Sequence, residues 1–163
     1  MLIRELRPDD SIEELTALLH RAYKQLADMG LRFLATHQDV ETTRRRIAKG
    51  VCFVAEEDGR IIGTITYNPP GTSKGSPYIE SSGAGHVQQM GIEPSLQGQG
   101  IASALMRHAE AFARATGATE MSLDTAETAT HLISWYERLG YRIVEKVQWE
   151  VTNYRSVVMG KRL

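Results

Sequence analysis

The stretch that decides the fold reads Met90-Gly91-Ile92-Glu93-Pro94-Ser95-Leu96-Gln97-Gly98-Gln99-Gly100-Ile101-Ala102. An apolar strand, expected over 86–92, leads into it. Gly98 and Gly100 let the backbone bend sharply and present several N–H groups to one anion. A helix with an apolar face follows at once, and its first amides lack intrahelical partners at the positive end of the helix dipole. The turn therefore predicts a phosphate site.

Two common nucleotide motifs do not fit this turn. It lacks the Gly-Lys-Ser/Thr of a P-loop, and its glycines do not have the G-x-G-x-x-G spacing of a dinucleotide site. On the glycines alone, a purely structural strand-to-helix turn remains an alternative.

The rest of the chain alternates helical and strand patterns around this turn. Upstream we expect a strand over 2–6, a helix from near Ser11, a helix over 39–49, and two strands, over 51–56 and 60–67, joined by an Asp-Gly hairpin. Downstream we expect a helix to Thr116-Gly117, a strand over 120–125, a helix ended by Gly140, and strands over 142–151 and 155–159. Residues 68–84 show no periodicity and predict a loop, our candidate for the acceptor side.

Composition limits the classes of partner. The chain has 163 residues, 42% of them hydrophobic, which suits one domain over 1–163. Its formal net charge of -1 supplies no field for nucleic acid or an anionic membrane, and no apolar stretch is long enough for a span, so we expect a cytoplasmic protein. Cys52, the single cysteine, lies in an apolar run, and the histidines show no ligand spacing, so no metal is expected.

Two motifs together resemble those of a known family. Gln97, Gly100 and Ala102 occupy the defined positions of the Q/R-x-x-G-x-G/A signature of the GNAT superfamily of acetyl-coenzyme A N-acetyltransferases. The stretch Trp135-Tyr136-Glu137-Arg138-Leu139-Gly140-Tyr141 resembles the family's aromatic-Tyr-acidic-basic-Leu-Gly-aromatic ending. The resemblance implies an α/β (α+β) fold: one domain with a mixed, mostly antiparallel sheet of six to seven strands, flanked by about four helices.

The resemblance also implies where acetyl-coenzyme A binds as co-substrate. The pantetheine arm would lie in a V-shaped opening between the fourth and fifth strands, against the backbone of Met90, Gly91 and Ile92. A backbone N–H near Met90 or Ile92 would donate to the thioester oxygen. The pyrophosphate would be held by Gln97, Gly98, Gln99, Gly100, Ile101, Ala102 and Ser103.

Tyr136 corresponds to the family's tyrosine that protonates the departing thiolate; its position on an apolar stripe keeps an ordinary core role as the alternative. Many relatives carry an asparagine seven residues earlier, where this chain has Ala129. Thr128, Thr130 and His131 are the candidates to replace that contact.

A base must accept the amine proton, and the fourth strand is the place to look. Histidine is the residue type that can exchange a proton near neutral pH, and His86, Gln88 and Met90, at even spacing, should share one strand face. A structural or polar role for His86 is the alternative, with Glu80 and Glu93 as further candidates. The 3′-phosphate could meet Arg107, Arg138 or Arg142, each equally explained as an exposed charge.

We therefore expect transfer of an acetyl group from acetyl-coenzyme A to a primary amine by direct attack in a ternary complex. The alternatives are a non-catalytic acyl-coenzyme A binding or sensor domain and a nucleotide-binding domain. The acceptor, a small molecule or peptide, is left open by the sequence, although Lys74, Tyr78 and Glu80 in the 68–84 loop could face it. Homodimers are common in the family, but no feature of the sequence identifies an interface.

Overall fold

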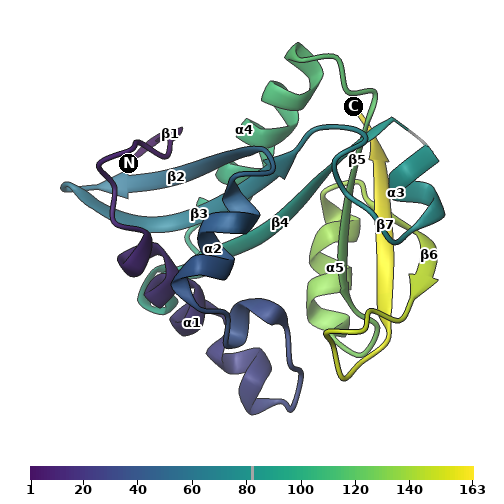
Figure 1. The fold of residues 1–163 in the computed structure, drawn as a ribbon, viewed down its shortest axis with the longest axis horizontal. Coiled ribbons are helices and arrows are strands. Elements are labelled where there is room, and N and C mark those ends of the chain that lie inside the picture. Colours follow the sequence, from purple (N-terminus) through teal and green to yellow (C-terminus); the bar gives the residue numbers. More distant parts are fainter. Residues whose placement is uncertain (82) are drawn as a thin grey trace.

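The computed structural model describes residues 1–81 and 83–163 and contains one seven-stranded sheet (Figure 1). The strand order is β1-β2-β3-β4-β5-β7-β6, and only β4 and β5 are parallel neighbours. This confirms the expected mixed, mostly antiparallel sheet. The strands are β1 (Leu2–Glu5), β2 (Val51–Glu57), β3 (Arg60–Asn68), β4 (Ala84–Ile92), β5 (Glu120–Ala126), β6 (Arg142–Val147) and β7 (Ser156–Arg162).

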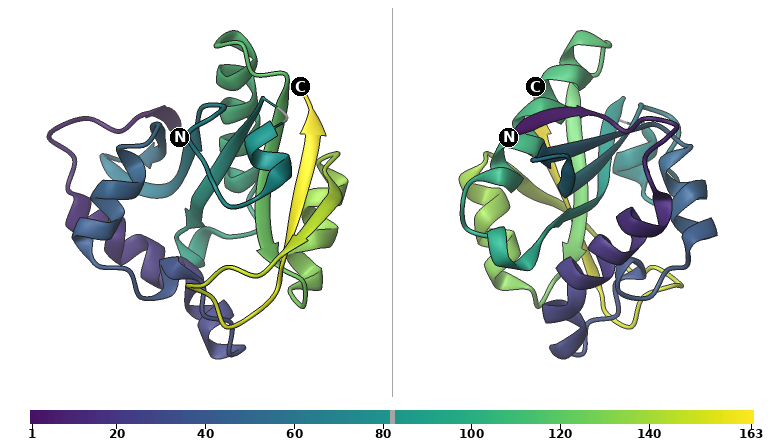
Figure 2. Two further views of the ribbon diagram at one scale, coloured as in Figure 1. Left: turned by 45° about the vertical axis from the view of Figure 1, so that its right-hand side comes forward. Right: turned by 90° about the vertical axis from the view of Figure 1, so that its left-hand side faces the viewer.

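Helices cover both faces of the sheet (Figure 2). They are α1 (Ile12–Asp28), α2 (Val40–Ile47), α3 (Pro77–Ser81), α4 (Ile101–Ala115) and α5 (Thr130–Arg138), with short 3₁₀ turns at Leu34–Thr36 and Pro94–Leu96. The helices α1 and α2 lie on one face, and α4 and α5 on the other. The expected loop over 68–84 was wrong in one respect, because it contains the short α3, which is too brief to show a period.

The core residues of β2 explain why its sequence is a continuous apolar run. Cys52 and Val54 pack with Leu15 of α1 on one face, whereas Phe53 belongs to the cluster that contains Leu105 of α4 on the other. A strand buried on both faces has no polar side to alternate with its apolar one.

The sheet opens between β4 and β5. These strands pair only at Ala84↔Glu120, Gly85↔Met121 and His86↔Ser122, after which they separate (Figure 1). The rest of β4 keeps β3 as its neighbour, and the rest of β5 keeps β7. The V-shaped opening implied by the resemblance to the family is therefore present.

A β-bulge in β4 changes which side chains share a face. Gln89 has a φ of 53°, and the register passes from Thr66↔Gln88 to Thr64↔Gly91, so one extra residue of β4 is accommodated. As a result, Gln88 accepts a hydrogen bond from a residue of α2 on one face, while Met90 packs into the core beneath α4 on the other. The expectation that Met90 shares a face with His86 and Gln88 was wrong, because even spacing fails across a bulge.

Candidate functional site

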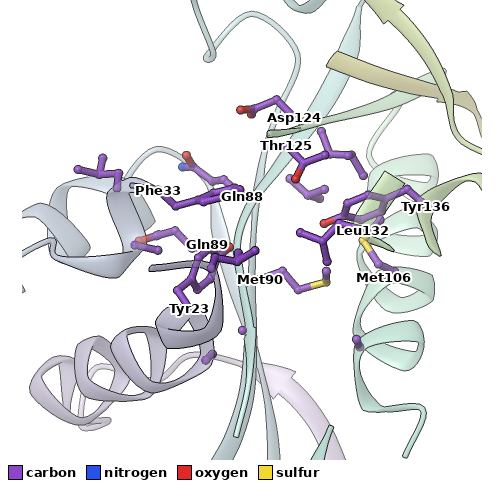
Figure 3. A pocket seen from close by; sticks show the side chains of 18 of the residues that line it. Tyr23, Phe33, Gln88, Gln89, Met90, Met106, Asp124, Thr125, Leu132 and Tyr136 are labelled. Atoms are coloured by element: carbon purple, nitrogen blue, oxygen red, sulfur yellow. The ribbon is translucent and has the colours of Figure 1, made fainter. Parts of the chain in front are cut away.

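A cavity of about 760 Å³ occupies the opening between β4 and β5 and is lined from both faces of the sheet (Figure 3). From one face come the glycine turn, α4 and α5; from the other come α1, α2 and the β6–β7 loop. The separation of the strands thus joins two differently lined compartments into one space.

The first compartment is built on the glycine turn. Gly98 and Gly100 have φ values of 78° and 84°, and an added Cβ would meet no atom within 4 Å at either position. These glycines are therefore needed for their left-handed backbone and not for space. Gly100 is the N-cap of α4, and within the described residues no side chain caps this helix start. The first amides of α4 are thus available to an anion in the cavity.

Tyr136 stands between the compartments. It comes from α5, and its hydroxyl points across the gap toward β4 (Figure 3). Within the described chain that hydroxyl makes no hydrogen bond, although the side chain is buried. Burial, with smaller contributions from Tyr23 and Asp124, raises the pKa of Tyr136 well above its ordinary value. The phenol therefore remains protonated at neutral pH.

A hydrogen-bonded chain across β4 and β5 forms one wall of the second compartment. His86 Nε2 lies 3.3 Å from Asp124 Oδ1, and its Nδ1 lies 2.9 Å from Ser122 Oγ. Trp149 Nε1 donates to Asp124 Oδ2 at 3.0 Å. Burial favours a higher pKa for Asp124, but the hydrogen bonds from His86 and Trp149 and the nearby positive charges outweigh it, so the pKa lies below the ordinary value. Asp124 is therefore ionised.

Aromatic rings form the opposite wall. Phe33 packs against Tyr154 with ring centroids 4.7 Å apart and against Tyr23 with centroids 5.6 Å apart. Burial raises the pKa of Tyr23 to about 12, so its hydroxyl is a neutral donor or acceptor. The second compartment consequently combines apolar surface with a fixed carboxylate.

Known proteins resemble this chain over most of its length. A sequence profile of the acetyltransferase (GNAT) family matches residues 14–141. The S-(2-succino)cysteine N-acetyltransferase of Bacillus subtilis (strain 168) is 37% identical over 131 residues, which are 79% of this chain and 77% of that protein. The chain belongs to the GNAT acetyltransferase family. It is thus a member of a family of acyltransferases.

Solved structures give the same fold for this GNAT chain. A protein from Pyrococcus horikoshii OT3 superposes with a TM-score of 0.75 at 21% identity, covering 99% of this chain and 98% of the other. A GNAT family acetyltransferase from Brucella melitensis, solved in complex with acetyl-coenzyme A, has a TM-score of 0.63 at 26% identity, covering 86% and 82%.

The predicted donor-site residues of this GNAT protein lie together. Met90, Gly91, Ile92 and all of the 97–103 turn line the cavity, except Gln99, which is exposed. The side chain of Gln97 donates to the carbonyl of Ile92 at 3.3 Å and braces the turn against β4. Of the three candidates to replace the family's asparagine contact, His131 lines the cavity, whereas Thr128 and Thr130 do not.

Other predicted residues are placed elsewhere. Glu80 accepts from the Gly75 amide and Glu93 pairs with Arg21 at 2.8 Å; neither lines the cavity. His86 does line it, with both ring nitrogens engaged as described. The three arginines considered for the 3′-phosphate, Arg107, Arg138 and Arg142, are exposed and lie outside the cavity lining. From the 68–84 loop, Lys74 lines the cavity and Tyr78 does not.

Several residues that line the cavity were not predicted from the sequence. Asp124 falls with Glu120 and Ser122 on the polar positions of an alternating strand, so its sequence pattern is that of an ordinary solvent-facing residue. Tyr23 and Trp149 also line the cavity without a distinguishing pattern in the sequence. Arg46 belongs to the run Arg44-Arg45-Arg46, which in sequence could bind a phosphate but is more simply interpreted as an exposed helix face. In the residues that the structure describes, no group of three or more His, Cys, Asp or Glu side chains could hold a metal, and no helix could cross a membrane.

Because the folded state lowers the pKa of Asp124, its carboxylate stabilises the protein above the unfolded pKa of about 3.9 and ceases to do so as pH falls through the folded value. We predict that Asp124→Asn lowers the free energy of unfolding at about pH 7 and that this deficit shrinks toward about pH 3. Urea unfolding of the variant and the wild type at several pH values measures this difference in the free energy of unfolding. Asp28→Asn, at an exposed carboxylate of α1, is the control. A deficit independent of pH would contradict the assignment.

Proposed function

We propose that this protein transfers the acetyl group of acetyl-coenzyme A to a primary amine by direct attack in a ternary complex. The observation that carries the proposal is the cavity between β4 and β5, which joins a glycine turn suited to phosphate with a polar compartment on the other face. The two substrates could then meet where the strands separate, without a covalent acetyl-enzyme.

The chain's own residues fit the donor. The uncapped start of α4 and the left-handed glycines suit a pyrophosphate at 97–103. The part of β4 that β5 has left suits an extended pantetheine arm, and the backbone of Met90, Gly91 or Ile92 would donate to the thioester oxygen.

The reaction breaks the thioester C–S bond and forms a C–N bond. A protonated amine loses two protons overall: one goes to solvent, and one balances the proton gained by the sulfur. Tyr136 is the proposed donor to that sulfur, because its raised pKa keeps it protonated and its hydroxyl is not committed to another described group.

Asp124 and His86 have different proposed roles toward the acceptor amine. A carboxylate with a lowered pKa is a poor base, so we assign Asp124 to hold the ammonium group. We retain His86 as the proposed proton acceptor. If protonated, its ring could donate to both Asp124 and Ser122, because the Ser122 hydroxyl can direct its own hydrogen to the Gly85 carbonyl at 3.0 Å.

The experiment that tests the function is release of free thiol from acetyl-coenzyme A across a panel of amines. We expect turnover with at least one primary amine. The panel includes S-(2-succino)cysteine, the acceptor named for the Bacillus subtilis relative, together with polyamines, amino acids and peptides. Tight binding of acetyl-coenzyme A with no thiol released by any amine would instead support a non-catalytic acyl-coenzyme A binding domain.

We predict that Tyr136→Phe lowers kcat by about tenfold or more while leaving the affinity for acetyl-coenzyme A nearly unchanged, because only proton donation is lost. Thiol release measures kcat and calorimetry measures the affinity. Tyr141→Phe is the matched control, since its hydroxyl donates to Glu110 away from the cavity. Unchanged turnover in Tyr136→Phe would remove the hydroxyl from the mechanism.

We predict that Gly100→Ala weakens binding of acetyl-coenzyme A, because a left-handed conformation costs about 1–2 kcal/mol for a residue with a Cβ. Gly117→Ala is the control: it has a φ of 97° at the other end of α4, also with open space around it. Both variants should lose similar stability in urea. Equal loss of cofactor affinity in both would argue against a specific role for the turn.

A further inference from the structure

Arg46 is a cation without a carboxylate partner in the second compartment of the cavity. It projects from α2, and in the described chain no carboxylate oxygen lies within 4 Å of it. Two other cations with little exposure do have such partners: Arg4 pairs with Asp10 at 2.7 Å, and Lys161 pairs with Glu110 at 2.9 Å. Arg46 is therefore an exception that needs an explanation.

Neutral amides hold Arg46 in place. One terminal nitrogen of its guanidinium donates to Gln38 Oε1 at 2.6 Å, and the other donates to Gln88 Oε1 at 2.9 Å. Gln38 in turn donates to Thr43 and to Gln89, both at 2.7 Å, which ties the arginine to the bulge of β4. The guanidinium is thus fixed before any ligand arrives, and its remaining N–H donors have no partner among the described residues.

This arrangement is electrostatically incomplete. Burial lowers the pKa of Arg46, because moving the charged guanidinium out of water is unfavourable. An arginine nevertheless stays charged, so its charge must be balanced by another group. Asp124 acts on Arg46 only from beyond ion-pair distance, because its hydrogen bonds with His86 and Trp149 hold the carboxylate in the other wall, where each oxygen keeps a lone pair for a further donor. An anionic ligand would complete the site.

We propose that Arg46 binds a carboxylate of the acceptor, so that the acceptor is a small amino-acid-type molecule carrying both an amine and a carboxylate. This inference rests on the proposed function. The pre-organised guanidinium of Arg46 would donate hydrogen bonds to the acceptor carboxylate, and Asp124 would hold the acceptor ammonium group. The aromatic wall of Phe33 and Tyr154 would contact the acceptor's side chain. A simple amine would leave the charge of Arg46 unmatched.

The test compares each acceptor with its own primary amide, which keeps the shape and removes the negative charge. The probes are S-methyl-L-cysteine, L-methionine and L-phenylalanine, each of which carries a single carboxylate, and their α-carboxamides. For the best pair, wild-type kcat/KM should favour the acid, mainly through KM. In Arg46→Gln that acid-to-amide ratio should fall by about 10- to 100-fold, the range expected for a charge-assisted hydrogen bond.

The readout is the change of this ratio between variants. Amidation also alters the acidity of the α-amine, but that effect is the same in every variant and cancels. The ratio is taken within one preparation, so partial unfolding cancels too. Arg46→Lys should be intermediate, because it keeps the charge and loses the fork. Arg45→Gln, on the exposed face of the same helix, should keep the wild-type ratio.

The outcomes separate the two proposals. Acetylation of amines with the same acid-to-amide ratio in wild type and Arg46→Gln would overturn the carboxylate assignment and leave the proposed function standing. Acetylation confined to amines that lack a carboxylate would overturn it as well. Release of thiol by no amine at all would instead defeat the proposed function.

Discussion

The site depends on the loss of pairing between β4 and β5 after three residue pairs. Beyond His86 and Ser122 the two strands keep their outer neighbours and lose each other, so the sheet stays continuous at one end and opens at the other. A cavity crossing a sheet needs such a separation, because paired strands leave no passage between them. The bulge at Gln89 occurs in the same part of β4, where it turns Gln88 and Met90 toward opposite compartments.

The cavity gives its polar groups different ionisation states. Burial keeps Tyr136 protonated, hydrogen bonds keep Asp124 ionised, and Arg46 remains a cation held by neutral amides. A protein with almost no net charge can in this way place a proton donor, an anion and a cation in one cavity. Local backbone and side-chain geometry, and not net charge, determines what the cavity can bind.

The helix starts and ends and the hairpin at Asp58-Gly59 were predictable from local pattern because each depends on neighbours in sequence, whereas the mixed sheet was expected only from the resemblance to the family. Ser11 caps α1 through the Glu14 amide, and Asp58 and Gly59 have positive φ values at the hairpin turn. Prediction from sequence failed where contacts between residues far apart in the chain determine the local structure. At the bulge, Gln89 accepts a hydrogen bond from Gln38, 51 positions away, and the periodicity of β4 gives no indication of the extra residue.

The sequence by itself determined the glycine turn and the family ending around Tyr136, and hence the part of the cavity that we propose for the donor, because a turn and the helix after it are specified by consecutive residues. Only the tertiary structure decided the second compartment, which we propose for the acceptor. Arg46 meets Gln88 across 42 positions and Trp149 meets Asp124 across 25. In sequence Arg46 is one of three similar charges. In the fold, α2 packs against α1, and hydrogen bonds to Gln38 and Gln88 hold Arg46 in the cavity lining while Arg45 stays exposed.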